Sequence, residues 1–279
     1  MSTTRFALLL VAACSSKKSA PVPALPCLPG EISSTGTGIA AVEGITAHAC
    51  WGERCLTLDR EGKATGPADH DATESARRAA ADALVAEVSL GDANVITVCD
   101  RGGHGRCVEM PVPSTWTGPS LSPTLAASAS HKRLTAFLVD RMETWEPKTK
   151  TLIASFPTTG SILEARFVGD ARVLSRTAAG DAWMLHDTLS GQSMPVGEPG
   201  WDLTVIDAKT AVVVHDARLA VVNAAGMAAG ASFNLPGHVA MATAWFDRIL
   251  VVLDHPAGTA QIDPATGTIY AGPALPTCK

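Results

Sequence analysis

The sequence is poor in aromatic side chains, which make up 5% of its residues and include a single tyrosine. Val, Leu, Ile and Ala must therefore build most of its hydrophobic core. Beyond the N-terminal segment, no stretch approaches the roughly 18–20 apolar residues that a membrane helix requires. Basic residues are not in excess either, because 22 Lys and Arg stand against 27 Asp and Glu. This balance argues against nucleic acid or anionic lipid as a partner, since both are bound through clustered cations.

Signatures of catalysis are also missing. There is no G-x-S-x-G nucleophile motif, and the glycine-rich segment 102–105 precedes a predicted strand, so no helix dipole would hold an anion there. Adjacent residues point to opposite sides of a strand, so we expect no metal at the His-Asp dipeptides that begin at His70, His186 and His215. We therefore expect no catalytic residue, no cofactor and no metal ligand.

The N-terminus has the pattern of an export signal. Arg5 is followed by the apolar run 6–13 and then by Cys14, after which the chain becomes polar. The segment Val11-Ala-Ala-Cys14 resembles the lipobox of bacterial lipoproteins. This resemblance implies a signal peptide over 1–13, a lipid anchor on Cys14 and, because Ser15 follows it, an outer membrane lipoprotein that faces the periplasm or the cell surface. Residues 14–36 contain four prolines and several serines and are expected to form an extended tether.

The remaining six cysteines are consistent with export to an oxidising compartment. Cys50 and Cys55 bracket one short turn, and Cys99 and Cys107 bracket another, so each pair can face across a hairpin. The pairing Cys27–Cys278 then remains, with one residue near each end of the exported chain. A zinc site made by the two middle pairs is the alternative, but their spacing differs from the short C-x₂₋₄-C knuckles of zinc ribbons.

The sequence after the tether is patterned for β-structure and carries a repeat. Short apolar runs such as 134–139, 211–214 and 249–253 alternate with segments rich in Gly, Asp, Asn and Pro. In each copy of the repeat, an apolar strand is followed along the sequence by an acidic or amide residue, then by a tight turn, and then by a second strand. The Asp or Asn side chain caps the turn and a glycine adopts its positive φ. The turn residues are Asp59, Gly62, Glu146, Asp187, Gly191, Asn223, Gly226, Asp263 and Gly267.

The spacing of these turns predicts the fold. From Glu146 they advance by 41, 36 and 40 residues, and Glu109 falls between Asp59 and Glu146. A period near forty residues with about four short strands is typical of a β-propeller. We expect an all-β domain over 37–279 with six blades of four antiparallel strands, whose units begin near Gly38, Leu84, Leu121, Ser161, Trp201 and His238. Two stacked β-sandwiches are the alternative.

The segment 262–270, Ile-Asp-Pro-Ala-Thr-Gly-Thr-Ile-Tyr, resembles the D-x-x-T-G turn of quinoprotein-like propeller repeats. The tryptophan usual after that turn is absent, and so is the Gly-His and Trp-Asp pattern of WD repeats, so no functional residue is carried over. The six tryptophans occur about once per unit, and we expect them to fill the core between blades instead of stacking on sugars.

One segment departs from the β pattern. Residues 71–83 favour a helix, and Asp71 with Glu74 three residues later resembles a capping box. Because this segment falls between the first two units, we expect a short helix on a connecting loop.

These observations support three functional hypotheses. The first is a lipid-anchored, non-catalytic module that binds or scaffolds an envelope protein through the loops of one propeller face. The second is an enzyme or small-ligand binder that uses the central channel, which requires acids, His or Arg from several units to meet there. The third is a support for an envelope complex through the 71–83 helix.

Overall fold

The structure is a computed structural model that describes residues 38–41, 46–91, 94–101, 105–116, 123–158, 160–224 and 232–272. The expected signal peptide and tether lie outside the described residues. So do the predicted anchor Cys14, the predicted pair Cys27 and Cys278, and the turn residue Gly226. Among the residues described, no helix is long and apolar enough to cross a membrane.

In these described ranges, twenty-three short strands form six separate antiparallel sheets, each built from one continuous stretch of sequence. The first three sheets in chain order are as follows. Sheet 1 contains β1 (Gly38–Ala41), β2 (Ala47–Trp51), β3 (Arg54–Leu58) and β4 (Ala64–Ala68). Sheet 2 contains β5 (Ala86–Gly91), β6 (Val95–Asp100) and β7 (Cys107–Pro111). Sheet 3 contains β8 (Thr124–Ala127), β9 (Leu134–Phe137), β10 (Arg141–Glu146) and β11 (Thr151–Pro157).

The last three sheets each have four strands. Sheet 4 contains β12 (Glu164–Val168), β13 (Arg172–Arg176), β14 (Trp183–Asp187) and β15 (Ser193–Val196). Sheet 5 contains β16 (Asp202–Val205), β17 (Thr210–His215), β18 (Arg218–Asn223) and β19 (Ser232–Asn234). Sheet 6 contains β20 (Val239–Trp245), β21 (Arg248–Asp254), β22 (Ala257–Ile262) and β23 (Ile269–Ala271).

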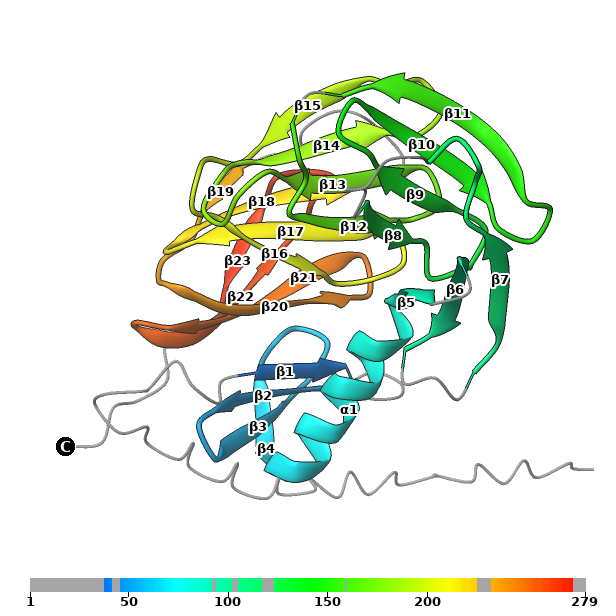
Figure 1. The fold of residues 1–279 in the computed structure, drawn as a ribbon. Coiled ribbons are helices and arrows are strands. Elements are labelled where there is room, and N and C mark those ends of the chain that lie inside the picture. The colour runs from blue at the N-terminus through cyan, green and yellow to red at the C-terminus, as the bar shows by residue number, and fades with distance from the viewer. Residues whose placement is uncertain are drawn as a thin grey trace, which may run out of the picture.

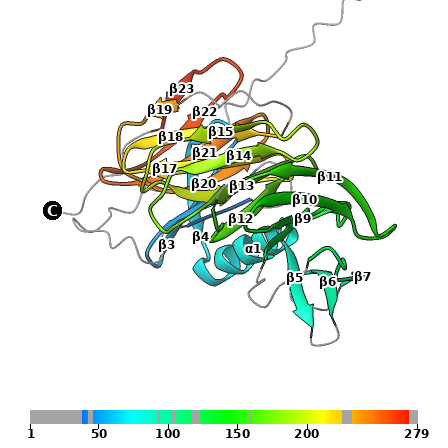
Figure 2. The same cartoon turned by 45° about the horizontal axis from the view of Figure 1, so that its top comes forward.

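The sheets follow one another around a ring (Figures 1 and 2), which makes the fold a β-propeller. The first strands face the centre, where β8 contacts β12, and β1 contacts β20 of the last sheet. In every four-stranded sheet the strands pair in chain order, so the fourth strand lies outermost. The predicted propeller is confirmed, and the prediction of two stacked sandwiches is wrong.

The core lies between neighbouring sheets. Separate clusters of buried apolar residues join sheets 2 and 3, 3 and 4, 4 and 5, 5 and 6, and 6 and 1. Val, Leu, Ile and Ala supply most of these side chains, as the composition predicts. Five of the six tryptophans are buried in them, and Trp145 packs against the cluster between sheets 2 and 3. Burial between sheets leaves these rings in the core and unavailable for sugar stacking.

Sheet 2 is the exception to the four-strand rule, because it has three strands among the residues described. Its β6 ends at Asp100, whose Oδ1 lies 3.0 Å from Nε2 of His131. His131 belongs to the turn between β8 and β9, where a first strand ends and a second begins. Since strand direction alternates, β6 must run as a third strand. The strands β5, β6 and β7 therefore run in the directions of second, third and fourth strands, and β5 contacts the first strand β8 of the next sheet.

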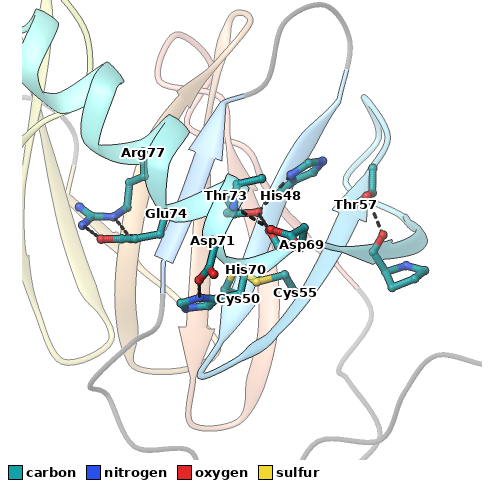
Figure 3. The surroundings of a disulfide bond; sticks show 12 residues. His48, Cys50, Cys55, Thr57, Asp69, His70, Asp71, Thr73, Glu74 and Arg77 are labelled. Carbon is teal, nitrogen blue, oxygen red and sulfur yellow. Dashed lines mark hydrogen bonds and ion pairs between the residues drawn. A yellow bond between two sulfur atoms is a disulfide. The ribbon is translucent and has the colours of Figure 1, made fainter.

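The helix α1 (His70–Ala83), the one helix in the part of the chain that the structure describes, precedes sheet 2 and confirms the predicted helical segment. The predicted capping box of Asp71 and Glu74 is wrong. Asp69 is the N-cap, and its side chain accepts a hydrogen bond from the Ala72 amide at 2.8 Å. Glu74 instead pairs with Arg77 at 2.6 Å and with Arg78 (Figure 3 shows the Arg77 pair).

As expected, α1 lies on the segment that connects the first two units, between β4 and β5. The helix crosses sheet 1, contacting β3, β2 and most extensively β1 (Figure 1). Near its start, Thr73 is buried and its hydroxyl lies 3.2 Å from Nδ1 of His48 on β2 (Figure 3). Burial lowers the pKa of His48. Arg77, Ala81 and Leu84 at its other end face the inner strands β16 and β20, so α1 reaches the centre of the ring.

No apolar cluster of the described residues joins sheets 1 and 2, between which α1 lies. The side of sheet 2 that faces away from sheet 3 is correspondingly polar and partly exposed. Ser89, Thr97 and Glu109 lie in register across its three strands, and Ser89 and Glu109 are exposed. The ring therefore contains five packed interfaces, and a helix spans the sixth.

Both short-range disulfides predicted from the sequence are present. Cys50–Cys55 joins β2 to β3 (Figure 3), and Cys99–Cys107 joins β6 to β7. In each pair the two residues lie directly opposite in the hairpin register. The zinc alternative is wrong, because all four sulfur atoms are used in these bonds. Disulfides of this kind indicate an oxidising, extracytoplasmic environment.

Candidate functional site

The repeat turns of the sequence lie where the third strand of a sheet turns into the fourth. Asp263 shows the mechanism, since its Oδ1 accepts hydrogen bonds from the amides of Ala265 and Thr266 at 2.9 and 3.1 Å. Gly267 closes the turn at φ +75°. The Thr266 hydroxyl and these amides lower the pKa of Asp263. This turn stabilises the end of its blade.

Asp187 and Gly191 form the equivalent turn of sheet 4. The amides of Leu189 and Ser190 both donate to Asp187 Oδ1 at 2.8 Å, and Arg172 forms an ion pair with its other oxygen. Burial alone would raise the pKa of Asp187, but these amides and Arg172 together bring it below its usual value.

The other predicted turn residues lie in corresponding places. Asp59 caps the turn between β3 and β4 by accepting from the Lys63 amide at 2.8 Å, with Gly62 at φ +79°. Glu146 ends β10 and accepts from the Thr149 hydroxyl at 2.9 Å, and Asn223 ends β18. Glu109 lies inside β7, so its assignment to the repeat is wrong. All of these residues shape blades, and none of them lines the hollow described next.

A hollow opens at the centre of the ring, at the end where first strands turn into second strands. This mouth pocket has a volume of about 430 Å³. Its walls come from the turns of sheets 3, 4 and 5, and its floor is Leu84, just beyond the C-terminal end of α1. Most of the lining is apolar or small, and the residues are Leu84, Ala129, Ser130, Phe167, Gly169, Asp170, Val205, Asp207, Ala208, Lys209 and Ala224.

The end of the ring around the mouth pocket is rich in lysine. Turns from first to second and from third to fourth strands lie at the same end, because strand direction alternates. Every lysine of the described residues lies in such a turn, namely Lys63, Lys132, Lys148, Lys150 and Lys209. We call this end of the propeller the lysine face. At the opposite end, Arg141 pairs with Glu143 and Arg218 pairs with Glu198.

The rim of the mouth pocket is connected across blades. The Ser130 hydroxyl donates to Asp170 Oδ1, and Lys132 Nζ lies 3.9 Å from Asp170 Oδ2, so sheets 3 and 4 are linked there. Lys209 has no ion pair with any described residue. The pocket thus combines an apolar interior with an edge that carries Lys209 together with the carboxylates of Asp170 and Asp207.

A second cavity of about 610 Å³, the inner chamber, lies in the channel beside β5. Its walls include Leu125, Ala126, Ala165 and Phe167, together with Glu87, Arg101 and Arg166. Arg101 is paired with Asp82 at 3.2 Å, and Arg166 with Glu164 at 3.3 Å. Cys99, which also lines this cavity, forms a disulfide with Cys107. Cys99 therefore offers no free thiol to this cavity.

Histidines gather at the end opposite the lysine face. His238 Nδ1 lies 2.7 Å from the buried Asp254 Oδ1, and His215 Nε2 lies 3.5 Å from Asp216 Oδ2. His215 and Asp216 do not alternate along a strand as expected, because Asp216 is in a turn at φ +50°. His70 and Asp71 do not alternate along a strand either, because both residues are in α1. No group of three or more potential ligands in the described residues is arranged to hold a metal ion.

Sequence reasoning missed the mouth pocket, since Leu84, Phe167 and Val205 come from three different units. It also missed Glu143, which is 3% exposed and accepts from the indole Nε1 of Trp116 at 2.6 Å and of Trp145 at 3.1 Å. The clustering of the lysines at one end of the ring could have been predicted, because the repeat places each of them in a turn between strands.

Comparison with known proteins adds little beyond the fold. No protein-family model matches the chain, and no curated protein is detectably related to it. Among solved structures, it is similar to apo AztD from Citrobacter koseri, at 11% identity over 86% of this chain and 72% of that one, with a TM-score of 0.41. Streptogramin B lyase gives 12% identity over 88% and 83% of the two chains, with a TM-score of 0.35. The Cps50 (Swd1) β-propeller domain of Myceliophteria thermophila gives 12% over 64% of each chain, with a TM-score of 0.35.

Proposed function

We propose that this chain is a lipid-anchored, extracytoplasmic β-propeller that binds an envelope protein without catalysing a reaction. One observation carries the proposal: an apolar hollow opens in the middle of the face that holds every described lysine. An apolar centre with a polar, charged rim is the usual anatomy of a protein-binding surface. The two disulfides support a location outside the cytoplasm.

The partner we propose presents an apolar side chain flanked by carboxylates. The side chain would enter the mouth pocket between Phe167 and Val205, and the carboxylates would approach Lys209 and Lys132. Burial of the apolar side chain supplies most of the affinity, whereas the rim charges mainly set specificity and association rate. A lipid on Cys14 and the tether after it would hold the propeller beside the membrane.

In-cell crosslinking and recovery of the full-length protein test this proposal. Envelope proteins should be recovered reproducibly with the native chain and lost with Cys14→Ala, which cannot be acylated. In a second arm, Lys132→Glu with Lys209→Glu should reduce recovery by at least tenfold. Lys63→Glu with Lys150→Glu is the matched control, because it reverses the same number of charges on the same face away from the mouth pocket.

Equal loss in both charge variants would mean that general electrostatics, and not the mouth pocket, attracts the partner. If no envelope protein is recovered with the native chain, the binding proposal fails. The alternative function, an enzyme or small-ligand binder that uses the central channel, would then be tested by screening small ligands against the inner chamber.

A further inference from the structure

The inner chamber lies among three neighbouring strands at the centre of the ring. β5 contacts β8, β8 contacts β12, and residues of all three strands line this cavity of about 610 Å³. A volume of this size is typical of small-molecule sites, which enclose a ligand between apolar walls and orient it with a few polar groups. The chamber therefore has the dimensions of a ligand site, and the chemistry of its walls indicates the ligand.

Part of the lining is apolar. Leu125 and Ala126 belong to β8, and Ala165 and Phe167 belong to β12. Ala126, Ala165 and Phe167 are buried members of the cluster that joins sheets 3 and 4, so packing holds this wall in place. A wall of this kind favours small or aliphatic groups on a ligand, because their removal from water is favourable.

Charged side chains of opposite sign come from the two strands that flank β8. Glu87 lies on β5 and is exposed, and the side chain of Arg166 on β12 is 50% exposed. Both residues line the inner chamber. One ligand-sized space is thus bordered by a carboxylate from one unit of the ring and by a guanidinium group from another.

The positive charge of Arg166 is only partly balanced by its neighbours. Its Nη2 lies 3.3 Å from Glu164 Oε1, but Arg176 donates two hydrogen bonds to the other oxygen of Glu164, at 2.8 and 3.1 Å. Two guanidinium groups therefore share one carboxylate. Arg101, the other arginine of the chamber, pairs with Asp82 at 3.2 Å. Arg166 is accordingly the group best suited to receive a carboxylate from a ligand.

Glu87 has the complementary role on the other strand. The residue directly opposite it on β6 is Cys99, whose disulfide carries no charge. An ammonium group of a ligand is the natural partner for this carboxylate. A ligand that satisfies both walls must therefore carry one ammonium group and one carboxylate, with an apolar part between them.

We propose that the inner chamber binds a short peptide with free termini, whose α-ammonium group pairs with Glu87 and whose α-carboxylate pairs with Arg166. Small or aliphatic side chains of the peptide pack against Leu125, Ala126 and Phe167. The volume of the chamber is that of a drug-sized ligand, which favours a peptide of a few residues over a single amino acid. This small-ligand site is additional to the protein-binding surface proposed above.

Three forms of the tripeptide Ala-Leu-Ala test the two charges separately. The first has free termini, the second is acetylated at its amino end, and the third is amidated at its carboxyl end. Calorimetric titration of each form into the full-length protein measures its Kd. We expect the acetylated and the amidated forms each to bind at least tenfold more weakly than the free tripeptide. Equal Kd values for the three forms, or no binding of the free tripeptide at millimolar concentration, would overturn the proposal.

Substitutions then assign each end of the peptide to a side chain. Glu87→Gln should weaken binding of the free tripeptide at least tenfold and abolish its advantage over the acetylated form. Arg166→Gln should likewise abolish the advantage of the free tripeptide over the amidated form. In this second variant Glu164 keeps Arg176 as its partner, so the protein should unfold at the wild-type temperature. Full retention of either advantage in its variant would contradict the assigned pairing.

Glu109→Gln and Arg106→Gln are the matched controls. Both residues are exposed in the hairpin of β6 and β7, and neither lines the inner chamber. Each control removes the same charge as its test variant and should bind all three tripeptides with the wild-type Kd. Equal losses in a test variant and its control would show that general electrostatics attracts the peptide, and the site would be wrong.

The inner chamber and the mouth pocket share Leu84, Phe167 and Val205 in their walls, so the two proposals need a test that separates them. Lys132→Glu with Lys209→Glu changes the rim of the mouth pocket alone. This double variant should lose the envelope partner but bind the free tripeptide with the wild-type Kd. A parallel loss of tripeptide binding would place the peptide in the mouth pocket and overturn the chamber site.

Discussion

Trp51 on β2 donates a hydrogen bond from its indole Nε1 to the main-chain oxygen of Leu253 on β21, at 2.8 Å. Two hundred and two residues separate the partners along the chain. Both side chains are buried, and Trp51 belongs to the apolar cluster that joins sheets 1 and 6. On the opposite side of this interface, Trp245 donates to the Arg60 carbonyl at 3.3 Å. The ring is therefore closed by side chains, without exchange of a strand between the first and last described sheets.

Trp51→Phe should lower the free energy of unfolding by about 1–3 kcal/mol, because the buried Leu253 carbonyl loses its donor. Hydrogen exchange at β20 should accelerate more than exchange at β16. Trp183→Phe is the control, since it removes a comparable bond to the Trp201 carbonyl at 3.0 Å in the interface of sheets 4 and 5. Equal acceleration at β20 in both variants would show that Trp51 has no special part in closing the ring.

The two disulfides should differ in their reactivity. Cys50 and Cys55 are 3% and 4% exposed, whereas Cys107 is exposed on sheet 2. A mild reductant should therefore open Cys99–Cys107 in the native protein, while Cys50–Cys55 should react only after unfolding. Alkylation followed by mass spectrometry measures the order, and simultaneous loss of both bonds would contradict it. Replacing Cys50 and Cys55 together with Ser should cost about 2 kcal/mol of stability.

A matched pair of glycines separates backbone strain from steric clash. Gly191 and Gly267 occupy equivalent turns at φ +73° and +75°. An added Cβ would meet open space at Gly267, but at Gly191 it would lie 2.4 Å from a carbon of the Phe156 ring. Gly267→Ala should therefore cost about 1–2 kcal/mol for the left-handed backbone alone. Gly191→Ala should cost a further 1–3 kcal/mol or so, and equal losses in denaturant unfolding would contradict the clash.

Stability should fall on acidification because of His186. This side chain is buried between the hydroxyls of Ser175 and Ser193, at 2.7 and 2.8 Å, and burial lowers its pKa from 6.5 to about 4. Below pH 6.5 the imidazole of His186 is protonated in the unfolded chain, whereas in the native state it stays neutral down to about pH 4. The free energy of unfolding should therefore decrease between these values by up to about 3 kcal/mol.

His186→Gln retains groups that can bond to both serines but does not titrate. Urea unfolding of this variant at several pH values between 4 and 7 should show a shallower dependence on pH than the wild-type protein. An unchanged slope would mean that other groups produce the acid sensitivity.

The fold was largely readable from the sequence because its determinants are local. The predicted starts at Leu121, Ser161, Trp201 and His238 fall within three residues of β8, β12, β16 and β20. Capped turns with glycine recur in the sequence at the blade period, and hairpin cysteines face each other whatever surrounds them. These features require no knowledge of how the sheets pack.

The place of α1 and the three strands of sheet 2 could not be read in the same way. Helix propensity locates residues 71–83 as a helix, but their contact with β1 and the centre of the ring depends on how the sheets are arranged. The unit expected at Leu84 begins with β5, and its sheet has three strands among the described residues. The helix before β5 is the one local mark of this difference in the part of the sequence that the structure describes.

Because every sheet is built from one continuous segment, each blade can form from residues that are close in sequence. Loop closure within a blade involves short separations and is entropically cheap, whereas joining sheet 1 to sheet 6 closes a loop of about two hundred residues. The blades should therefore acquire structure before the ring does. The docking of β1 against β20 becomes the late step of folding, and until it occurs the apolar surface around Trp51 remains open to misassociation with another chain.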